Sequence, residues 1–488
     1  MSVLLQVARW LFSGSDGKGG TVAEETWHVA RLIPTSGING AEEQERRATS
    51  ALLAVISAVR EFGRAILGPL GAPAGQYETY IEVPFADGDR NVYPDGLIRT
   101  RRGERSWTAL VEVKTSTNEL KADQLEAYLD VAKEQGFDAV ITISNQIPPA
   151  PGQHPTAVDR RKLRKVALHH LSWVQVLSTA VLQKEHRGVA DPDQAWILGE
   201  LIRYLEHPRS GAMAFEDMGS SWVSVREAVR AGTLRAHDKG VPEVAARFDA
   251  LLRYVGLRLG RRLGADVQPV LSRRELSEPA IRTDALVQSL TSHGIIAGAI
   301  RVPDAAATLQ VSADLRANQI ACHCDIDAPR QGRSRTRVNW LIRQLKDSPS
   351  LRVEAFVAHS RGASTAELLQ AIRENPDLLI GDGYKDIRSF RITQMTPMGT
   401  KRGIGRGSFI DSVVDAVDTF YGDVLQNLRA WRPAAPKLRE EPETPAVPPA
   451  LVSTALSSQD EPDRTQPSAP TPLQNSDRPP AVTDTASA

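Results

Sequence analysis

Residues 92–145 read VYPDGLIRTRRGERSWTALVEVKTSTNELKADQLEAYLDVAKEQGFDAVITISN, a pattern that predicts a strand, a turn, a strand, a helix and a strand. Successive side chains of a strand point to opposite faces, so Glu112 and Lys114 project to the same side. The short polar segment from Arg99 to Ser106 contains a glycine and is typical of a hairpin. Such a hairpin would bring Asp95, in the first of the two strands, toward Glu112.

These three charged side chains point to metal chemistry. Two carboxylates in one small patch repel each other and lose hydration, and a bound cation offsets both costs. The segment LVEVK lies between apolar residues and a following helix, a setting typical of a central strand. The alternative is a same-face ion pair of Glu112 and Lys114 on an exposed strand, with Asp95-Gly96 serving as turn residues. The expected burial of the strand favours the metal site.

The same residues resemble the signature of the PD-(D/E)xK, or restriction-endonuclease-like, nuclease superfamily. The resemblance covers about residues 40–185 and includes the Q-x-x-x-Y motif of the RecB-like branch. It implies an α/β fold in which a mixed central sheet is flanked by helices. The matching residues are Pro94, Asp95, Glu112, Val113, Lys114, Gln124 and Tyr128.

The resemblance also implies roles for the motif residues. Asp95, Glu112 and the carbonyl of Val113 would hold Mg²⁺ through oxygen ligands, and Mn²⁺ is expected to substitute. Lys114 would position the attacking water or stabilise charge on the phosphate in the transition state. Two further catalytic candidates, which would orient the substrate or support the site, are Gln124 and Tyr128.

A fourth acidic ligand is expected from the helix that precedes the signature, because many members of the superfamily carry one there. Glu45 lies one heptad before Leu52 and so falls on the buried face of the predicted helix. An acidic first turn that complements the helix dipole explains Glu45 equally well. Glu78 and Glu82, which share a face of the strand predicted at 76–85, are alternative acidic ligands.

The overall charge excludes one simple route to nucleic-acid binding. Of 488 residues, 24% are charged, and 59 basic residues balance 59 acidic ones, so the net charge is zero. No global basic field draws this chain to a polyanion, and any contact must use local patches. Two patches are candidates, and a solvated surface is the alternative for both. They comprise Arg333, Arg335 and Arg337 near Trp340, and Lys401 and Arg402 in the Gly-rich segment MGTKRGIGRG.

The length and the shifts in composition predict several regions. The second of the two folded domains shows the pattern of an α+β domain on a largely antiparallel sheet, and we recognise no family in it. The tail is rich in proline, lacks aromatic residues and is expected to be disordered. The predicted regions are an arm (1–38), the nuclease-like domain (39–190), a helical connector (191–265), the α+β domain (266–432) and the tail (433–488).

Local patterns predict further details. They indicate one helix from about Ala41 to Leu67, a helix at 119–135 capped by Asn118, a helix capped by Ser172, a helix at 365–374, and a solvated basic helix face with Arg253, Arg258, Arg261 and Arg262. His169 and His170 are adjacent, so a strand would point them to opposite faces, which suits structural roles better than a metal site.

Cysteine usage and hydropathy bear on the compartment. Cys322 and Cys324 are the only two cysteines and flank His323, a pattern that favours the apolar face of a strand over a disulfide or a zinc site. A reduced, cytoplasmic compartment is the simplest interpretation. The N-terminus lacks a basic leader and a cleavage pattern, and no apolar run is long enough to span a membrane.

The sequence thus predicts a metal-dependent nuclease that hydrolyses phosphodiester bonds, in DNA rather than RNA. One alternative is a catalytically inactive nuclease-like fold that serves as a nucleic-acid- or protein-binding module. Another is a recruiting protein whose C-terminal domain or tail binds a protein partner. Metal binding separates the first two, because an inert scaffold has no reason to keep Asp95, Glu112 and Lys114 together.

Overall fold

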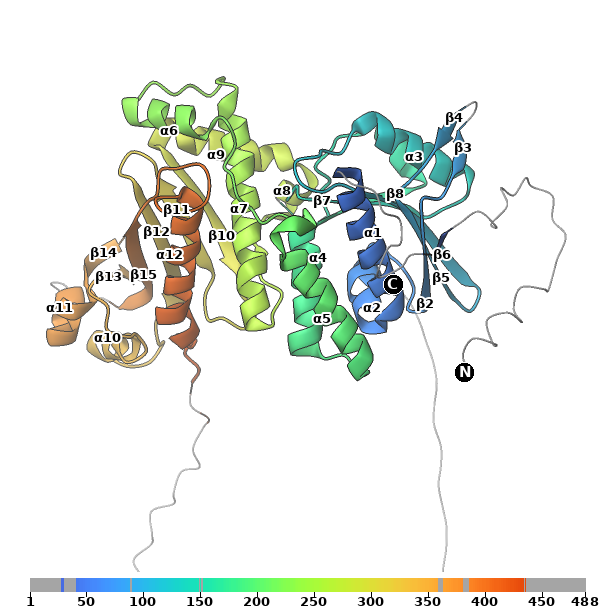
Figure 1. Ribbon diagram of the computed structural model, residues 1–488. Coiled ribbons are helices and arrows are strands. Elements are labelled where there is room, and N and C mark those ends of the chain that lie inside the picture. Colours follow the sequence, from blue (N-terminus) through green and yellow to red (C-terminus); the bar gives the residue numbers. More distant parts are fainter. Residues whose placement is uncertain are drawn as a thin grey trace, which may run out of the picture. The chain divides into compact units, whose positions relative to one another are not determined.

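Two β-sheets and the helices packed on them organise the chain in the computed structural model (Figure 1). The structure describes residues 28–29, 41–87, 90–148, 150, 152–358, 363–380, 386–433 and 435. The predicted arm (1–38) and the predicted Pro-rich tail (433–488) therefore lie almost entirely outside the described residues. The fold of the described residues is mixed α/β, with one mixed sheet, one large antiparallel sheet and a two-stranded antiparallel sheet.

The N-terminal sheet is mixed, as predicted. Its strands lie in the order β1-β2-β5-β6-β7-β8, antiparallel from β1 to β6 and parallel from β6 to β8. The predicted hairpin joins β5 to β6, but its strands run almost to its tip, where Arg102 pairs with Arg105. The strands are β1 (His28–Val29), β2 (Gln76–Ile81), β5 (Gly96–Arg102), β6 (Arg105–Val113), β7 (Ala139–Ser144) and β8 (Ala167–Ser172).

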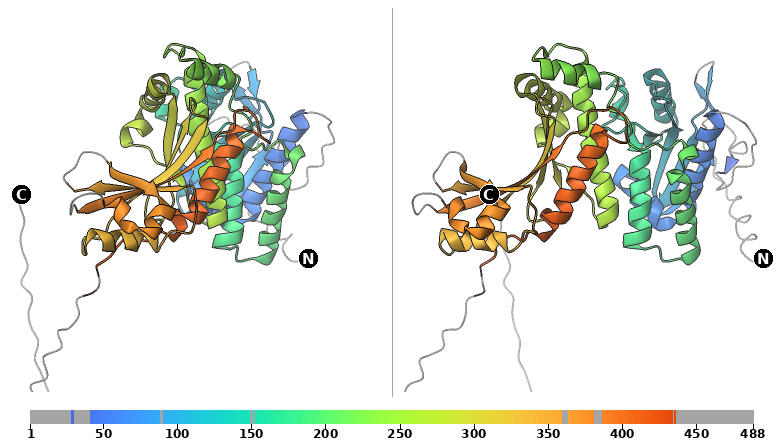
Figure 2. Two further views of the ribbon diagram at one scale, coloured as in Figure 1. Left: turned by 90° about the vertical axis from the view of Figure 1, so that its left-hand side faces the viewer. Right: turned by 60° about the vertical axis from the view of Figure 1, so that its left-hand side comes forward.

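Helices cover both faces of this sheet (Figure 2). On one face lie α1 (Ala41–Ala58), α2 (Arg60–Leu67), α4 (Trp173–Val181) and α5 (Pro192–Glu206). On the other lie α3 (Ala122–Glu134) and the small hairpin of β3 (Phe85–Asp87) and β4 (Arg90–Val92). Val111 and Val113 of β6 pack on the first face and Leu110 on the second. Glu112 therefore projects toward the α3 side.

The single helix predicted from Ala41 to Leu67 is wrong in one respect, because the helix breaks at Val59. That residue is extended, with φ −107° and ψ 96°, and α2 begins at Arg60. The break frees the backbone N–H of Arg60, which donates to the side-chain oxygen of Gln194 at 3.3 Å. The bond comes from α5, so local helix propensity cannot predict it.

Two other boundaries differ from the prediction, and one cap is confirmed. The helix expected from residue 119 begins at Ala122, and Asn118 does not cap it but donates its side-chain N–H to Glu45 at 2.6 Å. Residues 363–368 form strand β14 rather than the start of a helix, because they pair with the neighbouring strand β13. Ser172 caps α4 by accepting the N–H of Gln175 at 3.2 Å.

The C-terminal sheet is antiparallel, with the order β14-β13-β15-β12-β11-β10-β9. Its strands are β9 (Gln268–Pro269), β10 (Ile295–Arg301), β11 (Leu309–Asp314), β12 (Gln319–Asp327), β13 (Leu351–Val357), β14 (Ala363–Leu368) and β15 (Ile387–Pro397). Its core also contains residues of α6 (Trp222–Ala231), α7 (Gly240–Leu263), α9 (Pro279–His293), α10 (Ser334–Ile342), α11 (Leu369–Glu374) and α12 (Phe409–Asp423), and α8 (Arg273–Ser277) precedes α9.

Cys322 and Cys324 lie on the apolar face of β12, as predicted. Both are buried in the core of the C-terminal sheet, and burial raises the pKa of each thiol to about 12. No helix in the described part of the chain is both long and apolar enough to cross a membrane.

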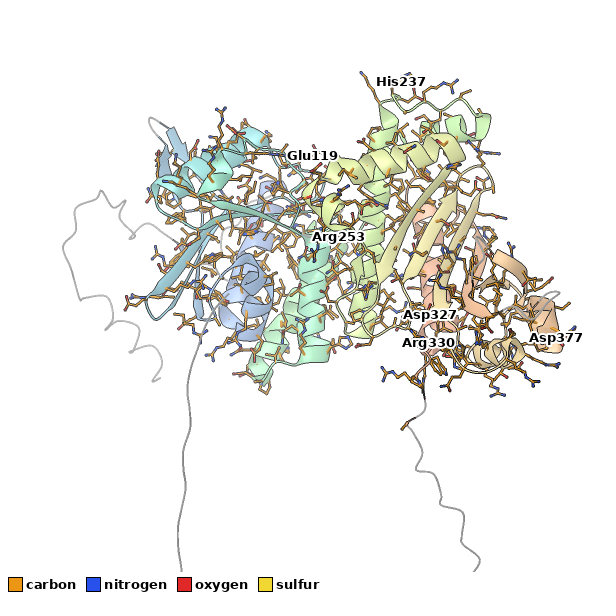
Figure 3. The ribbon with its side chains drawn as sticks, turned by 180° about the vertical axis from the view of Figure 1, so that it is seen from behind. Glu119, His237, Arg253, Asp327, Arg330 and Asp377 are labelled. Carbon is orange, nitrogen blue, oxygen red and sulfur yellow. The ribbon has the colours of Figure 1, made fainter. Side chains whose placement is uncertain are left out.

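Arg253 contradicts the prediction of a solvated basic face on α7, because it is only 4% exposed (Figure 3). Its guanidinium donates to the carbonyls of Pro148 and Ala150 at 2.9 and 3.0 Å and to the side chain of Gln175 at 2.8 Å. Arg253 thus holds the loop after β7 against α4 and α7. The neighbouring Arg258 pairs with Asp418 at 2.8 Å.

Of the two adjacent histidines, His170 has hydrogen bonds that suit the structural role predicted for the pair. His170 is buried, and its Nε2 lies 2.9 Å from the carbonyl of Gln146, so this nitrogen carries the proton. Its Nδ1 then accepts from the hydroxyl of Thr142 at 2.8 Å, and the same hydroxyl accepts from His154 Nε2 at 2.8 Å. Burial lowers the pKa of both His154 and His170, which favours the neutral rings that this chain of bonds uses.

Acid should therefore destabilise the fold through His170. Burial lowers its pKa from 6.5 to about 3, so between these values the unfolded chain binds one more proton than the folded one. The free energy of unfolding should fall by up to about 1.4 kcal/mol per pH unit as the pH drops from 6.5 toward 3. Urea unfolding at a series of pH values should show a shallower slope for His170→Gln. If His170→Gln kept the slope of wild type, this assignment would be contradicted. The control is His237→Gln, at an exposed position (Figure 3), which should keep the slope of wild type.

Candidate functional site

The six side chains that the sequence singled out around the motif lie together at one end of β6. Asp95 immediately precedes β5, where its carboxylate Oδ2 accepts the backbone N–H of Val113 at 2.7 Å. The next residue, Gly96, lets α1 and β2 pack close to the start of β5, because a Cβ there would lie 2.5 Å from Leu53 of α1 and 3.1 Å from the carbonyl of Tyr80. The hairpin thus ties Asp95 to the strand that carries Glu112.

Glu112 is the most buried of the charged groups, with 1% of its surface exposed. Its Oε1 lies 2.7 Å from the ammonium of Lys114 and also accepts the side-chain N–H of Gln124 at 2.8 Å. Its Oε2 is buried and has no hydrogen-bond partner among the described residues. A buried carboxylate oxygen without a partner is costly, which is a reason to expect a ligand at this position.

Gln124 and Tyr128 reach the site from α3, where they are one turn apart. The side-chain N–H of Gln124 lies 2.9 Å from the hydroxyl of Tyr128 as well as donating to Glu112. The Tyr128 hydroxyl donates to the backbone carbonyl of Tyr93 at 3.2 Å, which fixes the segment just before Asp95. Burial and the nearby Glu112 carboxylate raise the pKa of Tyr128 well above its usual value. Tyr128 therefore acts as a neutral donor.

Glu45 of α1 completes the cluster from the other face of the sheet. Its Oε2 lies 3.4 Å from the Lys114 ammonium, and its Oε1 accepts from the side chain of Asn118 at 2.6 Å and from the backbone N–H of Thr115 at 3.3 Å. The dipole interpretation of Glu45 does not account for these contacts. The sequence does not indicate that Asn118 is a partner of Glu45, because no local pattern links residues 73 positions apart.

The electrostatics of the cluster favour a bound cation. Burial, and after it the Glu112 carboxylate, raise the pKa of Asp95 well above its usual value. Burial works against the charged form of Lys114, but the carboxylates of Glu112, Asp95 and Glu45 together outweigh it, and the pKa of Lys114 is raised. The site therefore combines three carboxyl groups with a single ammonium group, which cannot neutralise all three when they are ionised. A cation would relieve both the repulsion and the unpaired oxygen.

The carboxylates of the two alternative acidic ligands have other partners. Glu78 is exposed on β2 and bonds to the hydroxyl of Tyr80 at 3.3 Å. Glu82 pairs with Arg46 at 2.6 Å on the surface. The backbone N–H of Glu82 donates to the carbonyl of Asp95 at 3.2 Å, but the Glu82 carboxylate is paired with Arg46. Glu45 is therefore the better candidate for a further acidic ligand.

The chemical types of the oxygen ligands fit a hard divalent cation, but their positions in the structure do not form a complete metal site. Its oxygens are carboxylates and, at Val113, a backbone carbonyl, which are the ligands that Mg²⁺ prefers. Among the described residues, no three His, Cys, Asp or Glu side chains are arranged so that they could hold a metal ion together. The ammonium of Lys114 lies 2.7 Å from Glu112 and 3.4 Å from Glu45. A cation held by these two carboxylates would compete with this ammonium for their negative charge.

The first basic patch is only partly available to a polyanion. Arg337 is buried, where its guanidinium donates to the carbonyl of Ile387 at 2.8 Å and to that of Gly332 at 3.1 Å. Arg337 is therefore not available to contact a nucleic acid, contrary to the prediction. Arg333 is exposed just before α10, and Arg335 is exposed but pairs with Asp377 at 3.1 Å.

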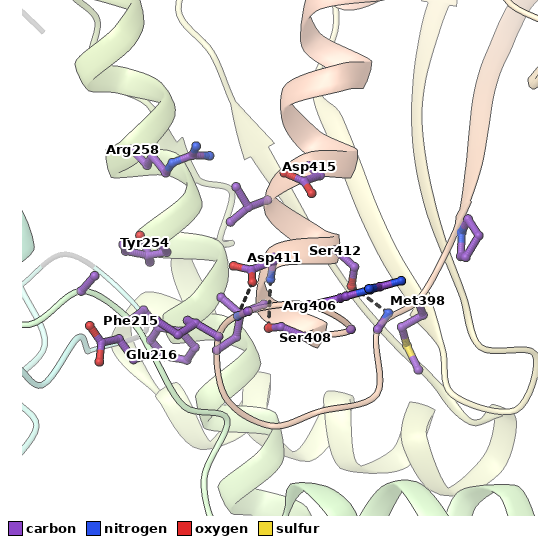
Figure 4. A pocket seen from close by; sticks show the side chains of 18 residues that line it. Phe215, Glu216, Tyr254, Arg258, Met398, Arg406, Ser408, Asp411, Ser412 and Asp415 are labelled. Carbon is purple, nitrogen blue, oxygen red and sulfur yellow. Dashed lines mark hydrogen bonds between the residues drawn. The ribbon is translucent and has the colours of Figure 1, made fainter.

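The second basic patch lies on the Gly-rich loop before α12. Lys401 and Arg402 are both exposed, and Arg402 pairs with Asp217 at 3.3 Å. The loop borders a cavity of about 840 Å³ (Figure 4). That cavity is not a clear phosphate site, since two arginines face three carboxylates in its lining. The charged lining residues are Arg258, Arg406, Glu216, Asp411 and Asp415.

Comparisons with known proteins do not assign a family. No family model, no curated protein sequence and no solved structure matches this chain.

Proposed function

We propose that this chain is a metal-dependent nuclease that hydrolyses phosphodiester bonds, with DNA favoured over RNA, on a restriction-endonuclease-like fold. The buried Glu112 supports the proposal most strongly, since one of its oxygens has no partner among the described residues and Asp95 lies close by. The mixed sheet with helices on both faces is compatible with the fold that the motif residues suggest.

Asp95, Glu112, the carbonyl of Val113 and Glu45 are the residues that would hold Mg²⁺ or Mn²⁺. When bound, such an ion polarises the scissile phosphodiester and lowers the pKa of a coordinated water. Asp95 is held for this role by the N–H of Val113, and Glu112 by Gln124. Proton release from Asp95 must precede binding, because its pKa is raised. Metal affinity should therefore increase with pH.

Lys114 is the residue placed to act on the substrate. Its side chain is 16% exposed, and its ammonium contacts both Glu112 and Glu45, so a phosphate or a water held at these carboxylates would lie beside it. A charged donor at that position stabilises the negative charge that develops as the phosphodiester is attacked. Gln124 and Tyr128 hold Glu112 and the segment before Asp95 in place.

One observation favours a second candidate function. The Lys114 ammonium already bridges Glu112 and Glu45, so the cluster is partly neutralised without a metal. A catalytically inactive nuclease-like fold that binds nucleic acid or protein would keep such an ion-pair network as a structural element. This candidate predicts no metal binding, whereas the nuclease requires it.

The test is a cleavage screen of the full chain. Single- and double-stranded DNA and RNA of mixed sequence are incubated with Mg²⁺ or Mn²⁺, with EDTA as the metal-free control. The proposal expects cleavage that depends on the metal and is strongest on DNA. No cleavage of any substrate with either ion would favour the binding module.

A further inference from the structure

A short segment after α5 packs against the loop that follows Lys114. We call residues 209–213 the strap. The backbone N–H of Ser116 donates to the carbonyl of Gly211 in the strap at 2.9 Å. Gly211 has φ +78°, and a Cβ there would lie 2.7 Å from both Gln44 and Thr115. Only glycine fits this contact without displacing the strap or the loop.

Two side-chain amides clamp the strap to the loop. Gln44 of α1 donates to the carbonyl of Arg209 at 2.7 Å, and its oxygen accepts from the hydroxyl of Ser116 at 2.7 Å. Asn145, just after β7, donates to the carbonyls of Ser116 and Gly211 at 2.9 and 2.8 Å. Its oxygen accepts the N–H of Met213 at 2.7 Å. Each amide thus uses both of its polar ends on this one contact.

The clamped loop carries the groups of the candidate site. Lys114 and Thr115 directly precede Ser116, and the N–H of Thr115 donates to Glu45. Ser116 has φ +56°, an uncommon backbone conformation for a non-glycine residue that needs support from its surroundings. The carbonyl of Lys114 accepts the indole N–H of Trp173 at 2.9 Å. The N–H of Lys114 donates to the carbonyl of Ile143 in β7 at 2.8 Å, so the loop acts on the residues after it. Through the N–H of Thr115 the loop holds Glu45, whose carboxylate in turn contacts the Lys114 ammonium.

The strap also continues into the C-terminal half of the chain. Five residues after Met213, the N–H of Met218 donates to the carbonyl of Arg402 in the Gly-rich loop at 2.9 Å, and Asp217 pairs with the side chain of Arg402. Phe215 and Glu216, between them, line the cavity beside that loop (Figure 4). One continuous segment thus contacts the loop after Lys114 and the Gly-rich loop.

We propose that the strap, clamped by Gln44 and Asn145, is a positioning element that sets the place of Lys114 and Glu45 and so ties the competence of the site to the C-terminal half. This inference rests on the proposed nuclease function for its effect on catalysis. Its structural part, the position of the loop, can be measured independently through Trp173.

Two variants test the strap. Gly211→Ala adds a Cβ that clashes with Gln44 and Thr115, and Gln44→Met removes the amide at similar volume. In the full chain, each should lower kcat for cleavage at saturating Mn²⁺ by about 10- to 100-fold, with KM changed much less, because reacting groups are misplaced rather than removed. In chains labelled with 5-fluorotryptophan, the ¹⁹F resonance of Trp173, assigned with Trp173→Phe, should shift in both.

Each control makes the same substitution as one of the two variants, at a position outside the strap and its clamp. Gly232→Ala introduces alanine at φ +68°, where a Cβ would meet no atom within 4 Å. Gln194→Met removes a half-buried amide of α5 that accepts from the N–H of Arg60 and does not bond to the strap. Both should keep the kcat and the Trp173 resonance of wild type. The proposal is overturned if Gly211→Ala and Gln44→Met also keep both, or if the controls lose as much activity. If wild type cleaves nothing, the proposed function fails, and the Trp173 resonance alone decides on the strap.

Discussion

Replacing Lys114 with methionine is expected to reduce cleavage at least about 1,000-fold while metal binding persists. The ammonium is the one charged donor of the cluster placed to contact a phosphate, and removing such a group typically costs two to four orders of magnitude in rate. The variant should bind Mn²⁺ at least as tightly as wild type, because the ammonium that lies 2.7 Å from Glu112 no longer repels the cation. Single-turnover cleavage and calorimetric titration measure the two effects.

Stability provides a second readout for the same variant. Without Lys114, the buried Glu112 loses its ionic partner, so the metal-free protein should melt at a lower temperature than wild type. Added Mn²⁺ should restore the melting temperature. Lys162→Met, which breaks the ion pair of Lys162 with Asp130 on α3, is the matched control and should cleave normally. A Lys114→Met variant that cleaves within tenfold of wild type would remove Lys114 from the mechanism.

Glu112→Gln is expected to abolish both cleavage and stabilisation by metal. The amide keeps the volume of the carboxylate but carries no charge, so the buried site loses the ligand on which the proposal depends most. Wild type should gain thermal stability as Mn²⁺ increases, since a ligand that binds only the folded state stabilises it. Glu112→Gln should show no such gain, and its cleavage should fall to background.

Glu78→Gln is the control for this experiment, because Glu78 was an alternative ligand by sequence and is exposed in the structure. It should retain both cleavage and the thermal shift. The account would be contradicted if Glu112→Gln were still stabilised by Mn²⁺ as strongly as wild type.

The sequence predicts that Asp95, Glu112, Lys114, Gln124 and Tyr128 come together, because the geometry that relates them is local. Strand alternation places Glu112 and Lys114 on one face, and a hairpin of fixed register brings Asp95 to the same end. Helical spacing places Gln124 and Tyr128 one turn apart on α3. The residues concerned, from Asp95 to Tyr128, lie within 34 positions of one another, so strand and helix periodicity suffices to relate them.

The surroundings of the site depend on contacts that local patterns do not encode. Asn118 reads as a helix cap but bonds to Glu45, which lies far away in the sequence. Nothing near Gln44 or Asn145 predicts a bond to the strap. In the sequence, Arg253 cannot be distinguished from the other arginines of the basic helix. In the structure, it is buried and donates to two carbonyls of the loop after β7. Tertiary packing, rather than propensity, decides each of these positions.

The most direct measurement of the central claim is calorimetric titration of Mn²⁺ into wild type and into Asp95→Ala/Glu112→Ala. The account predicts saturable binding to wild type that tightens with rising pH and disappears in the double variant. Circular dichroism of both proteins establishes that the double variant is folded. Equal binding to both proteins, or no binding to wild type even in the presence of a DNA oligonucleotide, would contradict the account.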